Sequence, residues 1–204
     1  RQMCIRDSLY PPLQAVDIKA LDLDIVHSGI DQRKVHMLVR DIFPKLGWKT
    51  PVAVHHRLLA GLGEPQSLGL DEDADADKVI SSKMSKSKPW TCIFIHDTTD
   101  EVEEKIRRAW CPPKVVEGNP ILEMARYIIF REKGVLEVDR PAKYGGPITF
   151  ESPDDLERSY AQGSLHPADL KATVAREIDK IITPLREYFE RRQDLLSVYR
   201  DESS

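Results

Sequence analysis

The pattern that most constrains the fold is an apolar strand, a helix and a second apolar strand within residues 21–55. Residues 21–28 alternate and are rich in aliphatic side chains, which indicates a buried strand ending at Gly29. Residues 31–43 carry apolar side chains at helical spacing, and residues 50–55 are again short and apolar. This order predicts a parallel βαβ unit, whose ligands bind beyond the carboxyl ends of its strands.

The second half of the chain is predicted to be helical. Helix-start signals with a capping residue or a proline occur at Thr98, Asn119, Ser152 and His166. Residues 135–149 contain glycine and proline, and they predict a connection with a short hairpin. The chain therefore combines a parallel α/β part with a small helical bundle.

Composition sets outer limits on function. The net charge of −4 neither indicates nor excludes an RNA partner, because a basic patch can be local. No apolar run is long enough to span a bilayer and no signal peptide is recognisable, so we expect a cytoplasmic protein without a membrane. The three cysteines lack metal-ligand or disulfide spacing. The acidic run of residues 71–77 is interpreted as a solvated insertion, and no metal site is predicted.

A lysine-rich segment carries the clearest chemical signal. Residues 83–87 read K-M-S-K-S, and we call them the lysine loop. Two lysines among small hydroxyl residues suit a polyphosphate, because mobile ammonium groups can meet the charge that develops when an ATP α-phosphorus is attacked. A solvated Lys/Ser loop is the structural alternative.

Four segments together resemble tyrosyl-tRNA synthetases of the archaeal and eukaryotic type, which belong to class I. They are Y-P-x-x-Q-x-x-D at 10–17, G-I-D-Q-R-K at 29–34, the lysine loop with C-P-P at 111–113 and E-G-N at 117–119, and K-Y-G-G at 143–146 with H-P-A-D-L-K at 166–171. The resemblance implies an α/β fold: the second half of a class I Rossmann-like parallel-sheet catalytic domain, followed by an all-helical anticodon-binding domain.

The resemblance also suggests how the chain divides. We expect a foreign or disordered leader at 1–8, the catalytic half with the lysine loop at 9–97, the anticodon-binding domain at 98–192 and a polar tail at 193–204. The other family signature, H-I-G-H, is missing, and His27-Ser28-Gly29-Ile30 does not replace it. We therefore expect a fragment that lacks the first half of the catalytic domain and is inactive or weak alone.

By resemblance, one group of residues binds tyrosine. Asp17 matches the carboxylate that accepts the phenolic hydrogen bond, and phenylalanine would leave that acceptor unpaired. Tyr10, Gln14 and Gln32 match positions that surround the ammonium with neutral oxygens. A surface role for Asp17, packing for Tyr10 and a helix start for Gln32 are the structural alternatives.

A second group is implied to bind ATP, which would bring Mg²⁺ with it. Gly29 matches the position where the backbone comes close to adenosine. Asp31 matches a position near the ribose hydroxyls, and it can also be explained as a helix cap. The stretch that the family places near adenine contains His55, His56, Leu58 and Leu59. Lys83 and Lys86 match the catalytic lysines that stabilise pyrophosphate. The remaining loop positions with implied ATP contacts are Met84, Ser85 and Ser87.

A third group is implied to read the tRNA anticodon. Tyr144, His166 and Asp169 match positions that meet its first base, where a ring can stack and a carboxylate can accept. His166 and Asp169 can also be explained as a helix start. Candidate phosphate contacts, each alternatively a solvated charge, are Arg107, Arg108, Lys114 and Lys171.

The function implied is tyrosine–tRNA ligation: tyrosine and ATP form tyrosyl-adenylate, and tyrosine then passes to the 3′ end of tRNA(Tyr) for protein synthesis. The resemblance also implies a homodimeric parent protein. Three alternatives stay open: a tryptophanyl-tRNA synthetase, a tRNA-binding module without catalysis, and an unrelated phosphate-binding α/β protein.

Overall fold

The computed structural model describes residues 5–67, 69, 74–85, 87–192 and 194, and these form two compact units. Unit 1 extends through Leu58 and includes Ser67–Ser81, whereas unit 2 comprises Leu59–Gln66 and the chain from Ser82 onward. The lysine loop therefore belongs to the same compact unit as the helices predicted for the second half of the chain. The predicted boundary at residue 97 placed it with the catalytic half, and that functional boundary stays a prediction.

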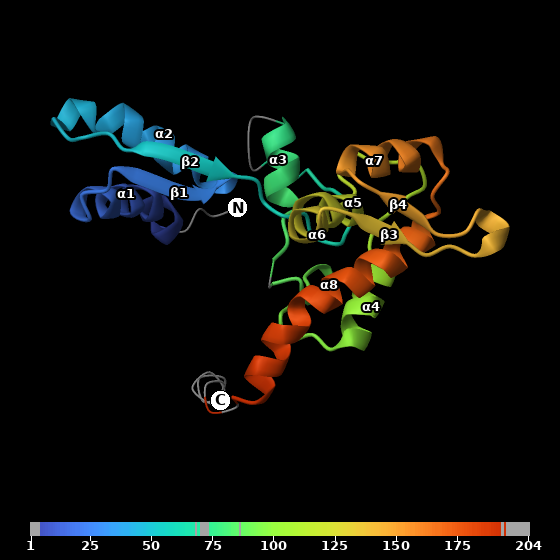
Figure 1. Cartoon of the computed structure of the whole chain (residues 1–204). Coiled ribbons are helices and arrows are strands. Elements are labelled where there is room, and N and C mark those ends of the chain that lie inside the picture. Colours follow the sequence, from blue (N-terminus) through green and yellow to red (C-terminus); the bar gives the residue numbers. More distant parts are fainter. Residues whose placement is uncertain (1–4, 68, 70–73, 86, 193, 195–204) are drawn as a thin grey trace. The chain divides into compact units, whose positions relative to one another are not determined.

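Unit 1 contains the predicted βαβ arrangement (Figure 1). Strands β1 (Ile25–Gly29) and β2 (Val52–His56) pair in parallel, with Gly29 opposite His56. The 3₁₀ turn η1 (Ile30–Gln32) and helix α2 (Arg33–Ile42) connect them. β1 begins later than predicted because residues 21–24 form a turn after the preceding helix, with Asp22 in the left-handed region at φ 50°.

Helix α1 (Ile5–Ala20) precedes this unit's strands. Its first turn lies within residues 1–8, for which a foreign or disordered leader is predicted, and residues 5–8 are helical. Residues 1–4 lie outside the described residues. Pro11 and Pro12 stand inside α1, where proline cannot donate the usual backbone hydrogen bond.

The apolar core of unit 1 lies on one face of its sheet. Ala15 and Ile18 of α1, Val26 of β1 and Val39 of α2 form one buried cluster with Phe43. The strand side chains that alternate with Val26 are instead exposed, and they include Ile25, His27, Val52, Val54 and His56. One sheet face is thus packed and the other faces water.

Helix α3 (Ala74–Ser81) contains part of the acidic run that is interpreted from the sequence as a solvated insertion. Asp77 is buried and accepts hydrogen bonds from the hydroxyls of Ser67 and Ser81 and from the Gly69 amide. The acidic stretch is therefore not solvated throughout, because one of its carboxylates organises the chain around α3. Residues 71–73 lie outside the described residues.

Unit 2 follows the predicted helix starts closely. The capping box of Thr98 and Glu101 begins α4 (Thr99–Arg108), and Asn119 caps α5 (Pro120–Met124). A π-helical turn at Ala125–Ile129 leads into α6 (Phe130–Lys133). The predicted hairpin is confirmed as antiparallel β3 (Leu136–Val138) and β4 (Ile148–Phe150).

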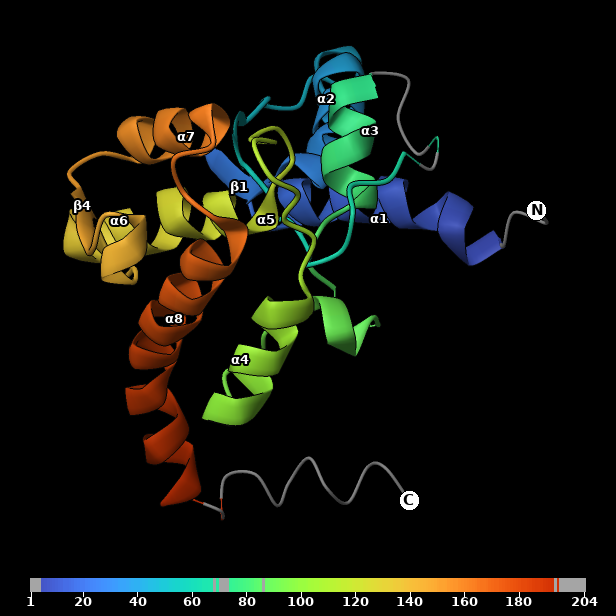
Figure 2. The same cartoon turned by 90° about the vertical axis from the view of Figure 1, so that its right-hand side faces the viewer.

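Two further helices complete unit 2. Ser152 caps α7 (Pro153–Gln162), and His166 caps α8 (Pro167–Glu190), which contains Pro184. Figure 2 shows α8 running beside α4, and the two share one core with α5 and α7. Among the residues that the structure describes, no helix is both long and apolar enough to cross a membrane.

A buried polar cluster joins the helices of unit 2. The Tyr160 hydroxyl on α7 donates to the Pro112 carbonyl at 2.9 Å and lies 3.2 Å from Cys111 Sγ. Asn119 donates from Nδ2 to the Val115 carbonyl at 2.9 Å, while its Oδ1 accepts from the first amides of α5. Burial raises the pKa of the Tyr160 phenol. The C-P-P and E-G-N motifs thus hold α7 against the start of α5.

Replacing Tyr160 with phenylalanine tests this cluster. Tyr160→Phe keeps the buried ring but leaves the Pro112 carbonyl without its donor, so we expect unfolding to need about 1–3 kcal/mol less. Urea unfolding followed by circular dichroism measures the change. Tyr188→Phe is the control. Because Tyr188 is exposed, this substitution should change the free energy of unfolding by no more than about 0.5 kcal/mol. Equal stability of the two variants would contradict a structural role for the hydroxyl.

Acid should weaken unit 1 through His36. Burial, and then the neighbouring His55, lower the pKa of His36 from its usual 6.5. The unfolded chain therefore binds a proton at a higher pH than the folded chain does, so stability is present above about pH 6.5 and is lost as the pH falls below it. Fluorescence of Trp48, which packs on Phe43, reports on unit 1 once Trp90 and Trp110 are phenylalanine. His36→Leu in that background should reduce the pH dependence, and an unchanged profile would exclude His36 as its source.

Candidate functional site

The lysine loop is held at both ends by one short segment of unit 2. Gly61 donates its amide to the Ser82 carbonyl at 2.7 Å, and Met84 donates to the Leu59 carbonyl at 2.8 Å. Beyond the loop, the Leu62 amide donates to the Thr91 carbonyl at 3.0 Å. Residues 59–62 therefore act as a strand-like clamp across the base of the loop.

Close packing explains the glycine in this clamp. A side chain at Gly61 would place its Cβ 3.2 Å from the Ser82 carbonyl oxygen and 3.3 Å from that of Thr91. Met84 packs against the core of unit 2, which anchors the loop. The Ser85 and Ser87 hydroxyls lie 2.9 Å apart. Lys83 pairs through its backbone with Ala60, and Lys86 lies outside the described residues.

The predicted tyrosine-binding residues of α1 share one helix face. Tyr10, Gln14 and Asp17 are spaced i, i+4 and i+7, and Gln14 lies one helical turn before the core residue Ile18. Tyr10 and Asp17 are exposed. Within the described residues, the Gln14 Oε1 atom is buried and has no hydrogen-bond partner. A buried acceptor of this kind can accept a hydrogen bond from a bound ligand.

Gly29 and Asp31 lie together at the carboxyl end of β1. A Cβ at Gly29 would come within 2.6 Å of both Asp31 Oδ1 and Leu58 Cδ2, so these two side chains would have to move if Gly29 carried a side chain. Gln32 ends the η1 turn next to Asp31. The parallel register sets His55 and His56 of β2 at this same end of the sheet, as the βαβ pattern predicts.

Two histidine pairs at this end were not predicted from the sequence. His56 Nδ1 lies 3.1 Å from His27 Nε2, and His36 Nδ1 lies 2.9 Å from His55 Nε2. Each pair can share one hydrogen bond when one ring donates and the other accepts. The strand register is needed to recognise these pairs, because His36 and His55 are 19 positions apart in the sequence and His27 and His56 are 29 positions apart.

The predicted anticodon residues come from two elements of unit 2. Tyr144 ends a 3₁₀ turn between β3 and β4, where its side chain is 61% exposed and the Lys143 ammonium lies 4.8 Å from the ring centroid. His166 Nδ1 accepts from the Ala168 amide at 3.1 Å, so its other ring nitrogen is available to donate. Asp169 lies in the first turn of α8.

Arg140 connects these elements and was missed by sequence reasoning. Its Nε donates to the Gly146 carbonyl at 2.9 Å, and its Nη1 donates to the Ser164 carbonyl at 3.0 Å. One guanidinium thus ties the Tyr144 turn to the segment that leads into α8. No local pattern marks Arg140, because Ser164 is 24 residues away.

Ion pairs fix the same hairpin to α8. Arg176 donates to the Glu137 carbonyl at 3.1 Å and pairs with Asp139. The adjacent Glu177 is buried, which raises its pKa, but hydrogen bonds from Lys133, Lys180 and Arg176 outweigh burial and lower that pKa to about 2. The hairpin that carries the Tyr144 turn is therefore held by charged contacts.

A groove of about 530 Å³ lies between α4 and the beginning of α8. Its walls combine charged and small apolar side chains from both helices: Glu103, Arg107, His166, Pro167, Ala168, Lys171, Ala172 and Ala175. The Lys171 ammonium donates to the Arg107 carbonyl at 3.0 Å, which holds one end of the groove together. His166 thus lines this groove and also belongs to the predicted anticodon set.

Metal-ligating side chains do not gather in the part of the chain that the structure describes: no group of three or more His, Cys, Asp or Glu is placed to hold an ion. Cys92 and Cys111 are buried and free of disulfides, whereas Cys4 lies outside the described residues.

Comparison with known sequences identifies relatives over both units. The tyrosine–tRNA ligase of Aeropyrum pernix is 49% identical over 179 residues, which cover 87% of this chain and 49% of that enzyme. The ligase of Thermococcus gammatolerans is 41% identical over 204 residues, covering 95% of this chain and 54% of that enzyme. The chain therefore spans about half the length of the curated relatives it matches.

Solved structures give the same result. The tyrosyl-tRNA synthetase of Pyrococcus horikoshii, complexed with L-tyrosine, superposes with a TM-score of 0.85 at 40% identity, over 98% of this chain and 57% of that one. A tryptophanyl-tRNA synthetase from Aeropyrum pernix is only 17% identical, at a TM-score of 0.62, and shares the fold alone. The resemblance to the tyrosine enzymes drawn from short motifs is confirmed.

The matching family model covers residues 3–183 and is described as tRNA synthetases class I (W and Y). It extends through both units and includes the α1 face, the end of β1, the lysine loop and the anticodon set. This chain therefore belongs to the class I tRNA synthetases of the tryptophan and tyrosine family.

Proposed function

We propose that the whole protein is a tyrosine–tRNA ligase, and that this chain supplies the second half of its catalytic domain and its anticodon-binding domain. The observation that carries the proposal is the 41–49% identity to tyrosine–tRNA ligases over most of the chain. The proposal includes a homodimeric protein that works in the cytoplasm, as the family implies. The assignment of residues 9–97 and 98–192 to the two domains is part of it.

Tyrosine recognition is assigned to unit 1. Asp17 would accept the hydrogen bond of the phenol, while Tyr10, Gln14 and Gln32 would surround the ammonium with neutral oxygens. The buried, unpaired Oε1 of Gln14 supports this role, because a bound ammonium would satisfy it. Discrimination against phenylalanine would follow from the unpaired Asp17 carboxylate, and the tyrosine enzymes are themselves the standard example of such discrimination.

Activation would consume ATP, which carries Mg²⁺ on its phosphates. The tyrosine carboxylate attacks the α-phosphorus, the bond to the β-phosphate oxygen breaks, and pyrophosphate leaves. Asp31 and the backbone at Gly29 would hold the ribose and adenosine, near the adenine-side stretch of His55 and His56. Lys83 and Lys86 would stabilise the charge on pyrophosphate, with hydroxyl donors from Ser85 and Ser87.

Transfer would then join tyrosine to the 3′-terminal ribose hydroxyl of tRNA(Tyr), as the bond between the tyrosyl carbonyl and the phosphate of tyrosyl-adenylate breaks and AMP leaves. Tyr144 would stack on the first anticodon base, and Asp169 and His166 would pair with its edge as acceptor and donor. The exposed Tyr144 ring and the donor available on His166 support this arrangement. An RNA-binding module without catalysis is the competing function for this chain alone, because it spans only about half of its relatives.

Tyrosine-dependent exchange of labelled pyrophosphate into ATP tests the proposal. The proteins are this chain alone and a chimera that adds the remaining catalytic half from the Aeropyrum pernix relative. We expect tyrosine-selective exchange in the chimera and little or none in this chain. Asp17→Ala in the chimera should lower kcat/KM for tyrosine about tenfold or more and narrow the preference over phenylalanine, because the phenol loses its acceptor.

Asp41→Ala is the control for charge loss, since Asp41 is an exposed carboxylate at the end of α2. Selective exchange with tryptophan would contradict the tyrosine assignment. A folded chimera with no exchange at all would leave the RNA-binding module as the better description.

Anticodon reading should depend on Arg140. Arg140→Met removes both hydrogen bonds that tie the Tyr144 turn to the segment before α8. We expect the preference for tRNA(Tyr) over a transcript with a changed first anticodon base to fall roughly three- to tenfold. Gel-shift titration of the two transcripts measures the preference, and pyrophosphate exchange by the chimera should not change. Arg131→Met, at an exposed arginine of α6, should leave the preference intact; an equal loss there would refute the positioning role.

A further inference from the structure

Trp90 is an exposed aromatic ring immediately after the lysine loop. It lies in the 3₁₀ turn η3 (Pro89–Thr91), and 67% of its surface is accessible. The turn is rigid, because the Thr91 amide and hydroxyl both donate to the Lys88 carbonyl, at 2.9 and 2.8 Å. The clamp at Leu62 also holds Thr91. A large apolar ring is thus fixed toward solvent at a defined place.

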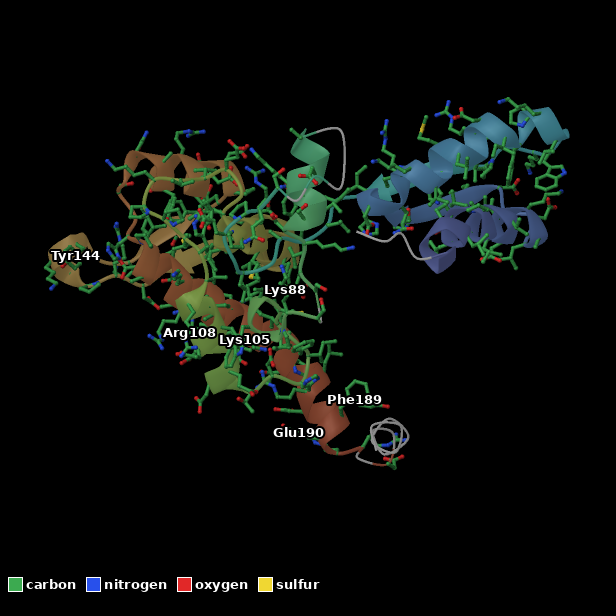
Figure 3. The ribbon with its side chains drawn as sticks, turned by 180° about the vertical axis from the view of Figure 1, so that it is seen from behind. Lys88, Lys105, Arg108, Tyr144, Phe189 and Glu190 are labelled. Carbon is green, nitrogen blue, oxygen red and sulfur yellow. The ribbon has the colours of Figure 1, made fainter. Side chains whose placement is uncertain are left out.

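Arg108 covers part of this ring. Its guanidinium carbon lies 5.5 Å from the Trp90 ring centroid, within the range of a cation–π contact. The Arg108 side chain is 63% exposed and also pairs with Glu104 on the same helix. Lys88, two residues before Trp90, is exposed as well. Figure 3 shows Lys88, Lys105 and Arg108 in one region of unit 2, away from Tyr144.

A small pocket opens beside the ring. Its volume is about 190 Å³, and Leu62, Gly63, Trp90, Thr91, Lys105 and Arg108 contribute to its lining. Lys105 is buried and paired with Asp97 at 2.6 Å, so it forms a neutral wall rather than a free charge. This volume is below the roughly 300–1,000 Å³ of a site that encloses a drug-sized ligand. The pocket fits a single ring system rather than a whole substrate.

We propose that Trp90 and Arg108 form a stacking site for one unpaired nucleotide of RNA, separate from the anticodon residues. Aromatic rings bind unpaired bases by stacking, and arginine adds both a planar surface and phosphate attraction. The site rests on the proposed function, in which tRNA must bring its single-stranded 3′ end to the lysine loop. Trp90 lies three residues beyond Ser87, on the same clamped base.

Fluorescence of Trp90 tests the site in the 204-residue chain. The probes are a minihelix with a single-stranded 3′ end, the same minihelix without that end, an anticodon stem-loop and ATP alone. We expect an RNA with unpaired nucleotides to quench the fluorescence. Comparison of the probes then shows whether the nucleotide comes from the 3′ end or from the anticodon loop. Trp90→Phe should lose the quenching and keep the affinity, whereas Trp110→Phe, which removes another tryptophan of unit 2, should keep both. The proposal would be overturned if ATP alone quenched the fluorescence equally, or if none of the RNA probes quenched it.

Binding by variants separates stacking from charge. Trp90→Leu should weaken RNA binding roughly tenfold or more at every salt concentration. Arg108→Gln should weaken it and also reduce the slope of log affinity against log salt by about 1. Arg158→Gln is the matched control, because Arg158 is 65% exposed and forms a similar helix ion pair, with Asp155. Equal effects of the two arginine variants would contradict the site.

The outcome is distinguishable from failure of the proposed function. If Trp90→Leu binds RNA like the unchanged chain while Asp169→Asn loses the preference for tRNA(Tyr), the stacking site is refuted and the tyrosine assignment stands. If the minihelix quenches Trp90 but the chain shows no preference for tRNA(Tyr), the stacking site stands and the tyrosine assignment fails.

Discussion

The lysine loop depends on a few backbone hydrogen bonds from residues 59–62. This segment holds the chain at Ser82 and Met84, where the loop begins, and at Thr91 after it, and the Leu62 carbonyl also accepts from the Trp110 amide just after α4. The clamp packs closely at Gly61, where a side chain would push against the carbonyls on either side. The loop therefore leaves from and returns to a base that backbone hydrogen bonds hold.

The two units divide the proposed work by substrate. Residues assigned to tyrosine and adenosine lie in unit 1, whereas the lysine loop and the residues assigned to RNA lie in unit 2. Within unit 2, the cluster of Tyr160, Cys111 and Asn119 joins α7 to α5, and Arg140 joins the β3–β4 connection to the segment before α8. Residues that meet opposite ends of a tRNA would therefore share one packed framework.

Local signals made much of this predictable. Thr98 with Glu101, and Asn119 with Pro120, act within three residues, so the helix starts can be read from the sequence. The βαβ order also follows from periodicity, whereas the tyrosine and anticodon sets rest on motif resemblance and stay predictions. Long-range contacts were not readable: Arg140 reaches Ser164, and His36 reaches His55. The acidic composition of residues 71–77 gave no indication of α3. Its buried Asp77 accepts hydrogen bonds from the hydroxyls of Ser67 and Ser81, and no periodicity in the sequence marks these contacts.

The water-facing side of the unit 1 sheet has a consequence for handling this chain. Ile25, Val52 and Val54 are exposed there, and a two-stranded parallel sheet within the described residues has an outer edge on each strand. Apolar strand faces and open edges favour addition of further strands, so they lower colloidal stability. These three exposed aliphatic side chains therefore favour association between copies of the 204-residue chain.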